Sequence, residues 1–224
     1  MIRAVIFDMD GVMIDSEPLW EKTERILLGR RGIDYNPPYR DKIVGLNQND
    51  SGKLLKETFN LPETVKELLE ERVEILLRLY ENELELVPGL LPLLKELKES
   101  GFLLALASSS PYRVIKFVLD KFSLNEFFRV VVSGDFVELG KPNPDIYLHT
   151  AKELGIYPSE CVVIEDSING LKSAKAAGMH CIAVPDKRLN QREFQIADLI
   201  LDRLDKVNTE VIRNLSGKID LVFS

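Results

Sequence analysis

Two aspartates near the start of the chain are spaced so that both carboxylates can face one pocket. Asp8 and Asp10 directly follow the apolar run 4–7, which is typical of a buried strand. In an open α/β sheet, ligands bind beyond the carboxyl ends of the strands, where these acids are expected. Two like charges this close raise at least one pKa unless a cation lies between them. The pair therefore indicates chemistry with a metal ion, a shared proton or both.

A serine and a lysine further along the chain can offer donors to an anion. Ser108 follows the apolar run 103–107, and its hydroxyl, like that of Ser109 beside it, can donate at a helix N-terminus. Lys141 lies between a glycine and a proline, so a stiff loop restricts its ammonium group. Alone, the serines would be interpreted as helix caps and the lysine as a solvated surface charge.

A second pair of acids follows another predicted strand. Glu165 and Asp166 come directly after the apolar run 161–164, and such acids can coordinate a hard cation through oxygen. Alone they could equally cap the helix that follows. Asp8 and Asp166 together could hold Mg²⁺, which prefers a few carboxylates, several waters and phosphate oxygens. The four groups of residues together predict a phosphoryl-transfer site.

The segments that must position these side chains alternate between strand and helix patterns. Apolar runs predict six strands, at 2–7, 102–107, 129–133, 161–165, 180–184 and 198–201. Helical patterns separate them from residue 88 onward, and continuous apolar strands between helices are typical of a parallel sheet covered on both faces. We therefore expect an α/β fold with a Rossmann-like, doubly wound parallel sheet.

Residues 16–86 interrupt this alternation, because they contain no convincing strand and several helical patterns. We predict that they form an all-helical cap domain, inserted into a catalytic core made of residues 1–15 and 87–224. An insert directly after the first strand can lie over the pocket as a lid. The alternative is that its helices only pack against the sheet.

Three helices are predicted within the insert, each with a recognisable start. The first begins at Ser16, the second is capped by Asp50, and the third spans about 62–80. At the other end of the chain, the sequence does not place residues 216–224.

Composition limits the partners and the compartment. The 224 residues carry a net charge of −7 without a basic block, which argues against nucleic acid and anionic membrane surfaces. No apolar run approaches the roughly 20 residues that span a bilayer, and no signal-peptide pattern is present, so we expect a cytoplasmic protein. A monomer is the simpler expectation. Cys161 and Cys181 are expected as buried apolar side chains rather than a disulfide or a metal pair.

The chemical motifs, in this order, resemble those of the haloacid dehalogenase superfamily. The matching segments are 8–12, Ser108, 141–145 and 165–167, and the resemblance covers nearly the whole chain. The helical insert resembles the small α-helical cap of that superfamily. Segment 15–20 resembles the branch of sugar-phosphate phosphatases, including 2-deoxyglucose-6-phosphate phosphatases, and their sister β-phosphoglucomutases.

The resemblance implies a role for each acid. Asp8 would attack phosphorus and form an aspartyl-phosphate. Asp10 would protonate the leaving alcohol and then deprotonate the water that hydrolyses the intermediate. Mg²⁺ would be bound by Asp8, the backbone carbonyl of Asp10, and Asp166, with Glu165 in or near its coordination shell.

The resemblance also implies how the substrate is held. Ser108 and Lys141 would bind the transferring oxygens, and Lys141 would also neutralise Asp8. The backbone N–H groups of Met9 and Asp10, together with Ser109, could add donors to the phosphate.

The predicted function is Mg²⁺-dependent hydrolysis of small sugar or polyol phosphates. The alternative is a β-phosphoglucomutase-type isomerase with the same aspartyl-phosphate chemistry. The mutases carry a histidine where this chain has Trp20, and an arginine in a loop that lacks one here, at 44–51. Trp20 could face the substrate or pack inside the cap. Sugar hydroxyls could meet Glu17, Asn47 and Gln48.

Two further alternatives remain at this point. A dehalogenase would need neither a metal ion nor a second aspartate, so Asp10 and the pair Glu165 and Asp166 argue against it. A non-catalytic binding protein on the same fold would be expected to lack one of the chemical residues, yet all are present.

Overall fold

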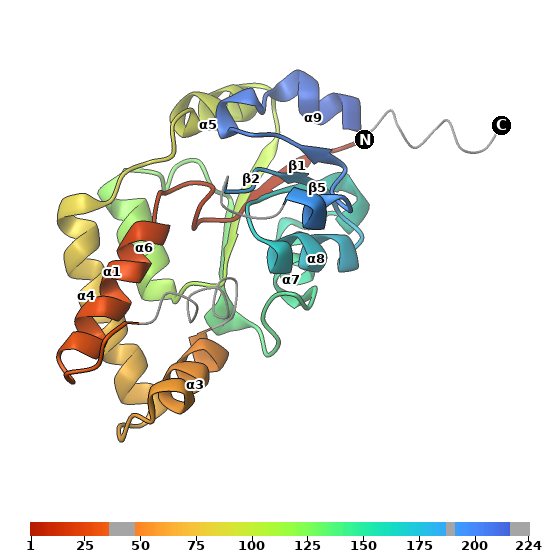
Figure 1. Ribbon diagram of the computed structural model, residues 1–224. Coiled ribbons are helices and arrows are strands. Elements are labelled where there is room, and N and C mark those ends of the chain that lie inside the picture. Colours follow the sequence, from red (N-terminus) through yellow and green to blue (C-terminus); the bar gives the residue numbers. More distant parts are fainter. Residues whose placement is uncertain (36–47, 187–190, 216–224) are drawn as a thin grey trace.

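The computed structural model describes residues 1–35, 48–186 and 191–215 (Figure 1). Within these ranges, six strands form one sheet. They are β1 (Ala4–Phe7), β2 (Leu103–Ser108), β3 (Val130–Ser133), β4 (Cys161–Glu165), β5 (His180–Ala183) and β6 (Leu199–Ile200). Every neighbouring pair of strands is parallel. The α/β class and all six strands predicted from the sequence are confirmed.

The order of the strands places β1 in the middle of the sheet. The order is β3-β2-β1-β4-β5-β6, so β1 pairs with β2 on one side and with β4 on the other. The direction of chain progression reverses between β1 and β4, and this reversal opens a crevice at the carboxyl ends of those strands. The acids after β1 and at the end of β4 therefore meet in the crevice where such sheets bind ligands.

Helices cover both faces of the sheet, as a doubly wound fold requires. On one face lie α5 (Leu90–Glu99), α6 (Tyr112–Lys121) and α9 (Thr209–Leu215), and on the other lie α7 (Asp145–Leu154) and α8 (Ile168–Ala176). Side chains of β1 alternate between the two faces of the sheet. Val5 packs in the hydrophobic core beneath α5, α6 and α9, and Ile6 packs in the core beneath α7 and α8. Cys161 and Cys181 are buried and free, as expected.

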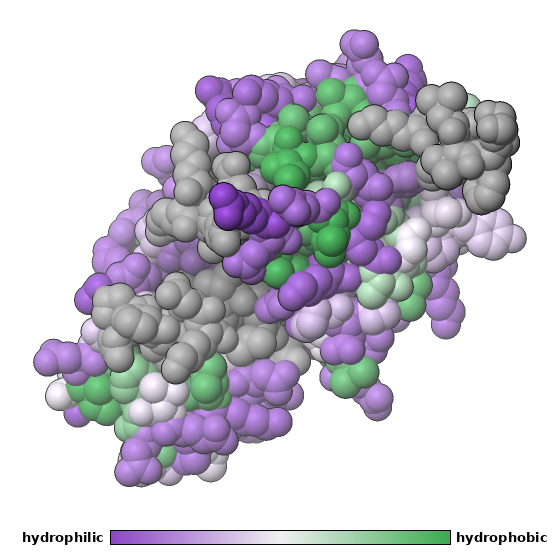
Figure 2. Space-filling view, turned by 45° about the vertical axis from the view of Figure 1, so that its right-hand side comes forward, coloured by the Kyte–Doolittle hydropathy of each residue, from purple (hydrophilic) through white to green (hydrophobic). Residues whose placement is uncertain are grey.

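Short 3₁₀ helices connect several of these elements. They are η1 (Gly134–Phe136), η2 (Pro158–Glu160), η3 (Gln191–Phe194) and η4 (Leu204–Lys206). On the face shown in Figure 2, hydrophobic side chains form limited patches among hydrophilic ones. Among the described residues, every helix is too short or too polar to cross a membrane.

Apart from α5, the described helices between β1 and β2 form the insert, which stands apart from the sheet in Figure 1. They are α1 (Glu17–Gly29), α3 (Gln48–Phe59) and α4 (Val65–Glu83). The chain enters and leaves the insert through two antiparallel segments, in which Asp15 N–H donates to Glu85 and Val87 N–H donates to Met13. The predicted boundaries of the cap domain, after residues 15 and 86, fall in these two segments and stay a prediction.

Two helix boundaries inside the insert differ from those predicted. The third helix begins at Val65 rather than near residue 62, because Thr64 forms a capping box with Glu67. Asp50 does not cap the second helix, which starts at Gln48 and contains Asp50 in its first turn. A carboxylate there still interacts favourably with the helix dipole.

Candidate active site

A buried lysine joins two of the predicted acids at the end of the sheet. Lys141, on the loop before α7, places its ammonium nitrogen 2.6 Å from Asp8 Oδ1 and 2.6 Å from Glu165 Oε1. All three side chains are at most 8% exposed. Residues that lie more than 130 positions apart in the chain thus form one compact charged cluster.

Burial and charge act on these groups in opposite directions. Burial raises the pKa of Asp8 to about 8, with Glu165 and Asp10 adding to the effect and Lys141 opposing it. Burial alone would lower the pKa of Lys141, but the carboxylates of Asp8 and Glu165 raise it above its ordinary value. The lysine therefore stays charged and favours the ionised form of Asp8, which is the form a nucleophile needs.

Glu165 has donors on both carboxylate oxygens. Oε1 accepts from Lys141 and, at 2.7 Å, from the hydroxyl of Tyr147. Oε2 accepts from the N–H groups of Asp166 and Ser167, both at 3.1 Å, and from the Ser167 hydroxyl at 3.0 Å. Although burial opposes it, Lys141 and these donors lower the pKa of Glu165. Glu165 is thus an ionised anchor for Lys141, and Tyr147 joins the site although no motif in the sequence pointed to it.

Two glycines leave room for the acids. A Cβ at Gly170, in the first turns of α8, would lie 1.6 Å from Glu165 Oε1. A Cβ at Gly11 would lie 2.0 Å from Asp166 Oδ2, and Gly11 also has a φ of +77°, which favours glycine. The close approach of backbone to carboxylate at both places requires a residue without a side chain.

Three acids of the site are arranged as a metal centre would need. Asp8, Glu165 and Asp166 each offer a carboxylate oxygen, and these oxygens lie within 4.8 Å of one another. Burial, followed by the charges of Glu165, Asp8 and Glu17, raises the pKa of Asp166 well above its ordinary value. One lysine does not balance three carboxylates, and an all-oxygen donor set suits a hard divalent cation. The residues therefore fit a bound metal ion.

Asp10 faces the insert with one of its oxygens. Its Oδ1 accepts from the Ser16 hydroxyl at 2.6 Å and from the Trp20 indole nitrogen at 2.9 Å, with the Tyr80 hydroxyl at 3.4 Å. Burial, with Asp10 adding, raises the pKa of Tyr80 well above its ordinary value, so its phenol remains a donor. No motif pointed to Tyr80, since its approach to Asp10 depends on how α4 packs.

The second oxygen of Asp10 faces the core of the sheet. Its Oδ2 accepts from Ser110 Oγ at 2.8 Å and lies 3.5 Å from Ser108 Oγ. Pro111 is the N-cap of α6, and the side chain of Ser110, directly before it, donates to Asp10. Asp10 is therefore held from both sides, by hydroxyl and indole donors.

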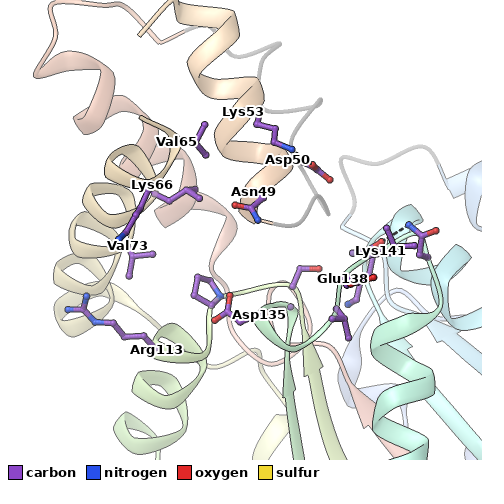
Figure 3. Close-up of a pocket in the computed structure, with 18 of the residues that line it drawn as sticks. Asn49, Asp50, Lys53, Val65, Lys66, Val73, Arg113, Asp135, Glu138 and Lys141 are labelled. Carbon is purple, nitrogen blue, oxygen red and sulfur yellow. Dashed lines mark hydrogen bonds and ion pairs between the residues drawn. The ribbon is translucent and has the colours of Figure 1, made fainter. Parts of the chain in front are cut away.

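A cavity of about 1070 Å³ lies between the insert and the end of the sheet (Figure 3). Helices α3 and α4 line one side, and the loop that leads to Lys141 lines the other. Its wall includes apolar side chains such as Val65 and Val73 and cations such as Lys66 and Arg113, which Figure 3 shows around the opening. An anionic group of a ligand could pair with these cations, and a polar ligand body could contact polar side chains of the wall such as Asn49 and Asp50.

The structure places the predicted substrate-binding residues differently. Ser109 lines the cavity, whereas the side chain of Met9 is buried in the core, so only its backbone could reach a phosphate. Asn47 lies outside the described residues, as does the side chain of Gln48. Asn49, the next residue along α3, lines the cavity.

The other two predicted cap contacts lie on α1. Glu17 is partly exposed, and its charge acts on Asp166. Trp20 is only 6% exposed and belongs to the main hydrophobic core, but its indole N–H reaches Asp10. The ring of Trp20 is thus buried, and its indole N–H makes a polar contact that neither sequence interpretation included.

Comparisons with known proteins agree with this geometry. The chain matches the family described as haloacid dehalogenase-like hydrolase over residues 5–184. It is 35% identical to hexitol phosphatase B of Escherichia coli K12, over 93% of this chain and 96% of that protein. It is 34% identical to a phosphorylated carbohydrates phosphatase of Thermotoga maritima, over 81% and 84%. A crystal structure of β-phosphoglucomutase from Clostridium difficile has a TM-score of 0.86 at 25% identity, covering 99% and 100%.

The match to the family begins within β1 and ends just after β5, so it includes both pairs of acids and Lys141. The resemblance found in the sequence is thereby confirmed. The chain belongs to the haloacid dehalogenase-like hydrolases, in the branch of sugar-phosphate phosphatases and β-phosphoglucomutase-like proteins.

Proposed function

We propose that this protein is a Mg²⁺-dependent phosphomonoester hydrolase that acts on small sugar or polyol phosphates. The observation that carries the proposal is the position of Asp8, at the end of the central strand, beside Lys141 and among acids that fit a cation. Two similar proteins are named as phosphatases of hexitols and of phosphorylated carbohydrates, which supports this substrate class.

In the proposed reaction, Asp8 is the nucleophile and Asp10 is the acid and base. A carboxylate oxygen of Asp8 attacks phosphorus, while Asp10 protonates the departing alcohol oxygen. Asp10 then takes a proton from the water that attacks phosphorus of the aspartyl-phosphate, which regenerates Asp8. The Lys141 ammonium group, 2.6 Å from Asp8, offsets negative charge that develops on the transferring oxygens.

Mg²⁺ is the cofactor that best suits the oxygen donors of the site. Asp8, Asp166 and the backbone carbonyl of Asp10 would hold it, with Glu165 at the edge of its coordination shell. When bound, the ion neutralises phosphate charge so that a carboxylate can approach phosphorus. Because donors already occupy both oxygens of Glu165, we assign that residue mainly to holding Lys141.

The substrate would lie with its phosphate at the sheet and its polyol part toward the insert. Ser108 ends β2, and Ser109 and Lys141 line the cavity at this end of the sheet. Helix α3 contributes Asn49 and Asp50 to the opposite wall. Contacts of sugar hydroxyls with Glu17, Asn47 and Gln48 remain part of this proposal.

A mutase remains the second candidate, since the fold is similar to that of a β-phosphoglucomutase over nearly the whole chain. The contact made by Trp20 favours hydrolysis. An indole N–H donates a hydrogen bond but has no titratable group, so Trp20 cannot relay a proton where the mutases carry histidine.

The proposal is tested by phosphate release from hexitol, hexose, pentose and glycerol phosphates, each with and without Mg²⁺. We expect Mg²⁺-dependent release, with polyol or sugar esters among the best substrates. In parallel, β-glucose 1-phosphate is assayed for both phosphate and glucose 6-phosphate. Faster formation of glucose 6-phosphate than of phosphate would identify a mutase, and no release from any ester would contradict the proposal.

A further inference from the structure

Trp20 connects Asp10 to a buried ion pair inside the insert. Its indole nitrogen lies 2.9 Å from Asp10 Oδ1, and its ring is buried. The guanidinium carbon of Arg72, on α4, lies 4.7 Å from the centre of this ring. Trp20 is the one tryptophan of the chain, so its spectroscopic signals report this contact alone.

Arg72 is in turn fixed by residues from the other two described helices of the insert. Its Nη2 lies 2.6 Å from Glu24 Oε1 on α1, and its Nη1 donates to Ser51 Oγ on α3 at 2.9 Å. The Glu24 and Arg72 side chains are 0% and 4% exposed. Burying two charges costs desolvation free energy, so such a pair is weak evidence for stability. Its contacts reach α1, α3 and the Trp20 ring, so it connects these parts of the insert.

A cation over an indole face also acts on the N–H group at the ring edge. The positive charge is attracted to the electron-rich face, and the effect is strongest where water is excluded, as it is here. Drawing electron density toward the cation leaves the ring N–H more positive and therefore a stronger donor to Asp10. Arg72 thus fixes the orientation of the ring and strengthens its hydrogen bond.

We propose that Trp20, held by the buried Glu24–Arg72 pair, is a positioning residue for the acid–base carboxylate of Asp10. The inference rests on the proposed function, in which Asp10 protonates the leaving alcohol. It also links two parts of the site, because Ser51, which Arg72 contacts, lies next to the residues of α3 that line the cavity. The packing of the insert and the placement of Asp10 are therefore coupled through one side chain.

The kinetic test uses Trp20→Phe, which keeps an aromatic ring under Arg72 but removes the N–H donor. The value of kcat/KM is measured for a hexitol phosphate and for 4-nitrophenyl phosphate, with Mg²⁺ present. An alkoxide needs a proton to leave and a nitrophenolate does not, so we expect a loss about tenfold larger for the hexitol ester. Equal losses for both esters, or no loss for either, would overturn the inference.

This comparison separates the inference from the function on which it rests. If the unchanged enzyme hydrolyses neither ester, the proposed function fails. If it hydrolyses both and Trp20→Phe loses activity equally on both, only the positioning role fails.

A second measurement does not depend on activity or on the folding of Trp20→Phe. In ¹H–¹⁵N spectra of the whole protein, the single indole resonance should move upfield in Asp10→Asn, because a neutral amide accepts more weakly. The double variant Glu24→Gln with Arg72→Met should also move it. An indole resonance unchanged in Asp10→Asn would overturn the inference.

The chain offers a matched control for the double variant. Lys22 and Glu83 form an exposed ion pair at 2.6 Å that joins the same two helices, α1 and α4. Lys22→Ala with Glu83→Ala should leave the indole resonance and both kcat/KM values unchanged. If the indole resonance moved as far in this control as in Glu24→Gln with Arg72→Met, any ion pair between α1 and α4 would have the same effect. That result would overturn the role of Arg72.

Discussion

Lys141 is the residue on which the charges of the site depend. It lies 2.6 Å from both Asp8 and Glu165, and burial removes water as an alternative partner for these carboxylates. The motif in the sequence predicted that Lys141 binds phosphate oxygens and neutralises Asp8. The structure adds that Lys141 lies equally close to Glu165. Removing the Lys141 side chain should therefore affect folding as well as catalysis.

Lys141→Met should therefore destabilise the protein strongly. It leaves two buried carboxylates without a counter-charge, a change that typically costs about 3–5 kcal/mol. Chemical denaturation measures the free energy of unfolding. The control is Lys22→Met, which removes an exposed ion pair and should cost at most about 1 kcal/mol. Similar losses in the two variants would contradict the importance of the buried cluster.

Asp10→Asn should slow turnover without preventing folding. An amide keeps the size of the carboxylate but cannot act as acid or base, and such catalysis contributes about 10²–10⁴-fold. Steady-state kinetics with a hexitol phosphate measures the loss, and a melting curve checks the fold. Asp50→Asn, an exposed acid on the cavity wall, should change kcat far less. A normal kcat in Asp10→Asn would rule out acid–base action by this residue.

The first turn of α8 packs closely against Glu165. Gly170 lies against Glu165, and the Ser167 side chain caps this helix while donating to the same carboxylate. The sequence predicted a helix after Glu165 and Asp166, but not that its third residue must be glycine. That requirement comes from the approach of α8 to β4, which no local pattern encodes.

Gly170→Ala should disturb Glu165 and, through it, Lys141. The added methyl group would overlap the carboxylate, and overpacking of this kind costs about 1–3 kcal/mol. We expect a lower free energy of unfolding and a lower kcat. Gly29→Ala is the control, because its new Cβ meets nothing within 4 Å, and alanine should stabilise the end of α1 by up to about 1 kcal/mol. Equal effects at both glycines would contradict the close contact.

The sequence predicted the sheet better than it predicted where the helices inside the insert begin. Strands buried on both faces appear as continuous apolar runs, so all six were found. The start of α4 depends on a capping box at Thr64 and was placed a few residues too early. Site residues directly after strands, such as Asp8, were found from position alone. Ser110 and Tyr147 were missed as site residues, since their contacts depend on loop and helix packing rather than on a motif.

The molecule as a whole is acidic, and so is its candidate site. The net charge is −7, and three acids face one lysine at the end of the sheet. Burial holds the pKa of Asp8 at about 8, against 3.8 for an ordinary aspartate, and also raises that of Asp166. A carboxyl whose pKa is raised on folding costs stability once it must ionise. The contribution of Asp8 to the free energy of unfolding therefore becomes less favourable as pH rises from about 4 to about 8.

Mg²⁺ should reverse this loss, because it binds the ionised carboxylates of the folded state. A ligand at 100 times its Kd stabilises by about 2.7 kcal/mol, which corresponds to roughly 5–10 °C for a chain of this size. We expect a larger rise in melting temperature at pH 8 than at pH 5, measured by calorimetry. Asp166→Ala is the control and should show little rise. An equal rise at both pH values, or in the variant, would argue against a metal bound by these acids.

The most direct test of the account is to look for a phosphoryl group on Asp8 during turnover. Wild-type enzyme and Asp10→Asn are mixed with Mg²⁺ and a hexitol phosphate, quenched in acid within the first turnover, and digested for mass spectrometry. The account predicts phosphorylation of the peptide that contains Asp8, with more accumulating in Asp10→Asn if hydrolysis of the intermediate is slowed further than its formation. Release of phosphate while Asp8 stays unmodified at every time point, together with turnover by Asp8→Asn, would contradict it.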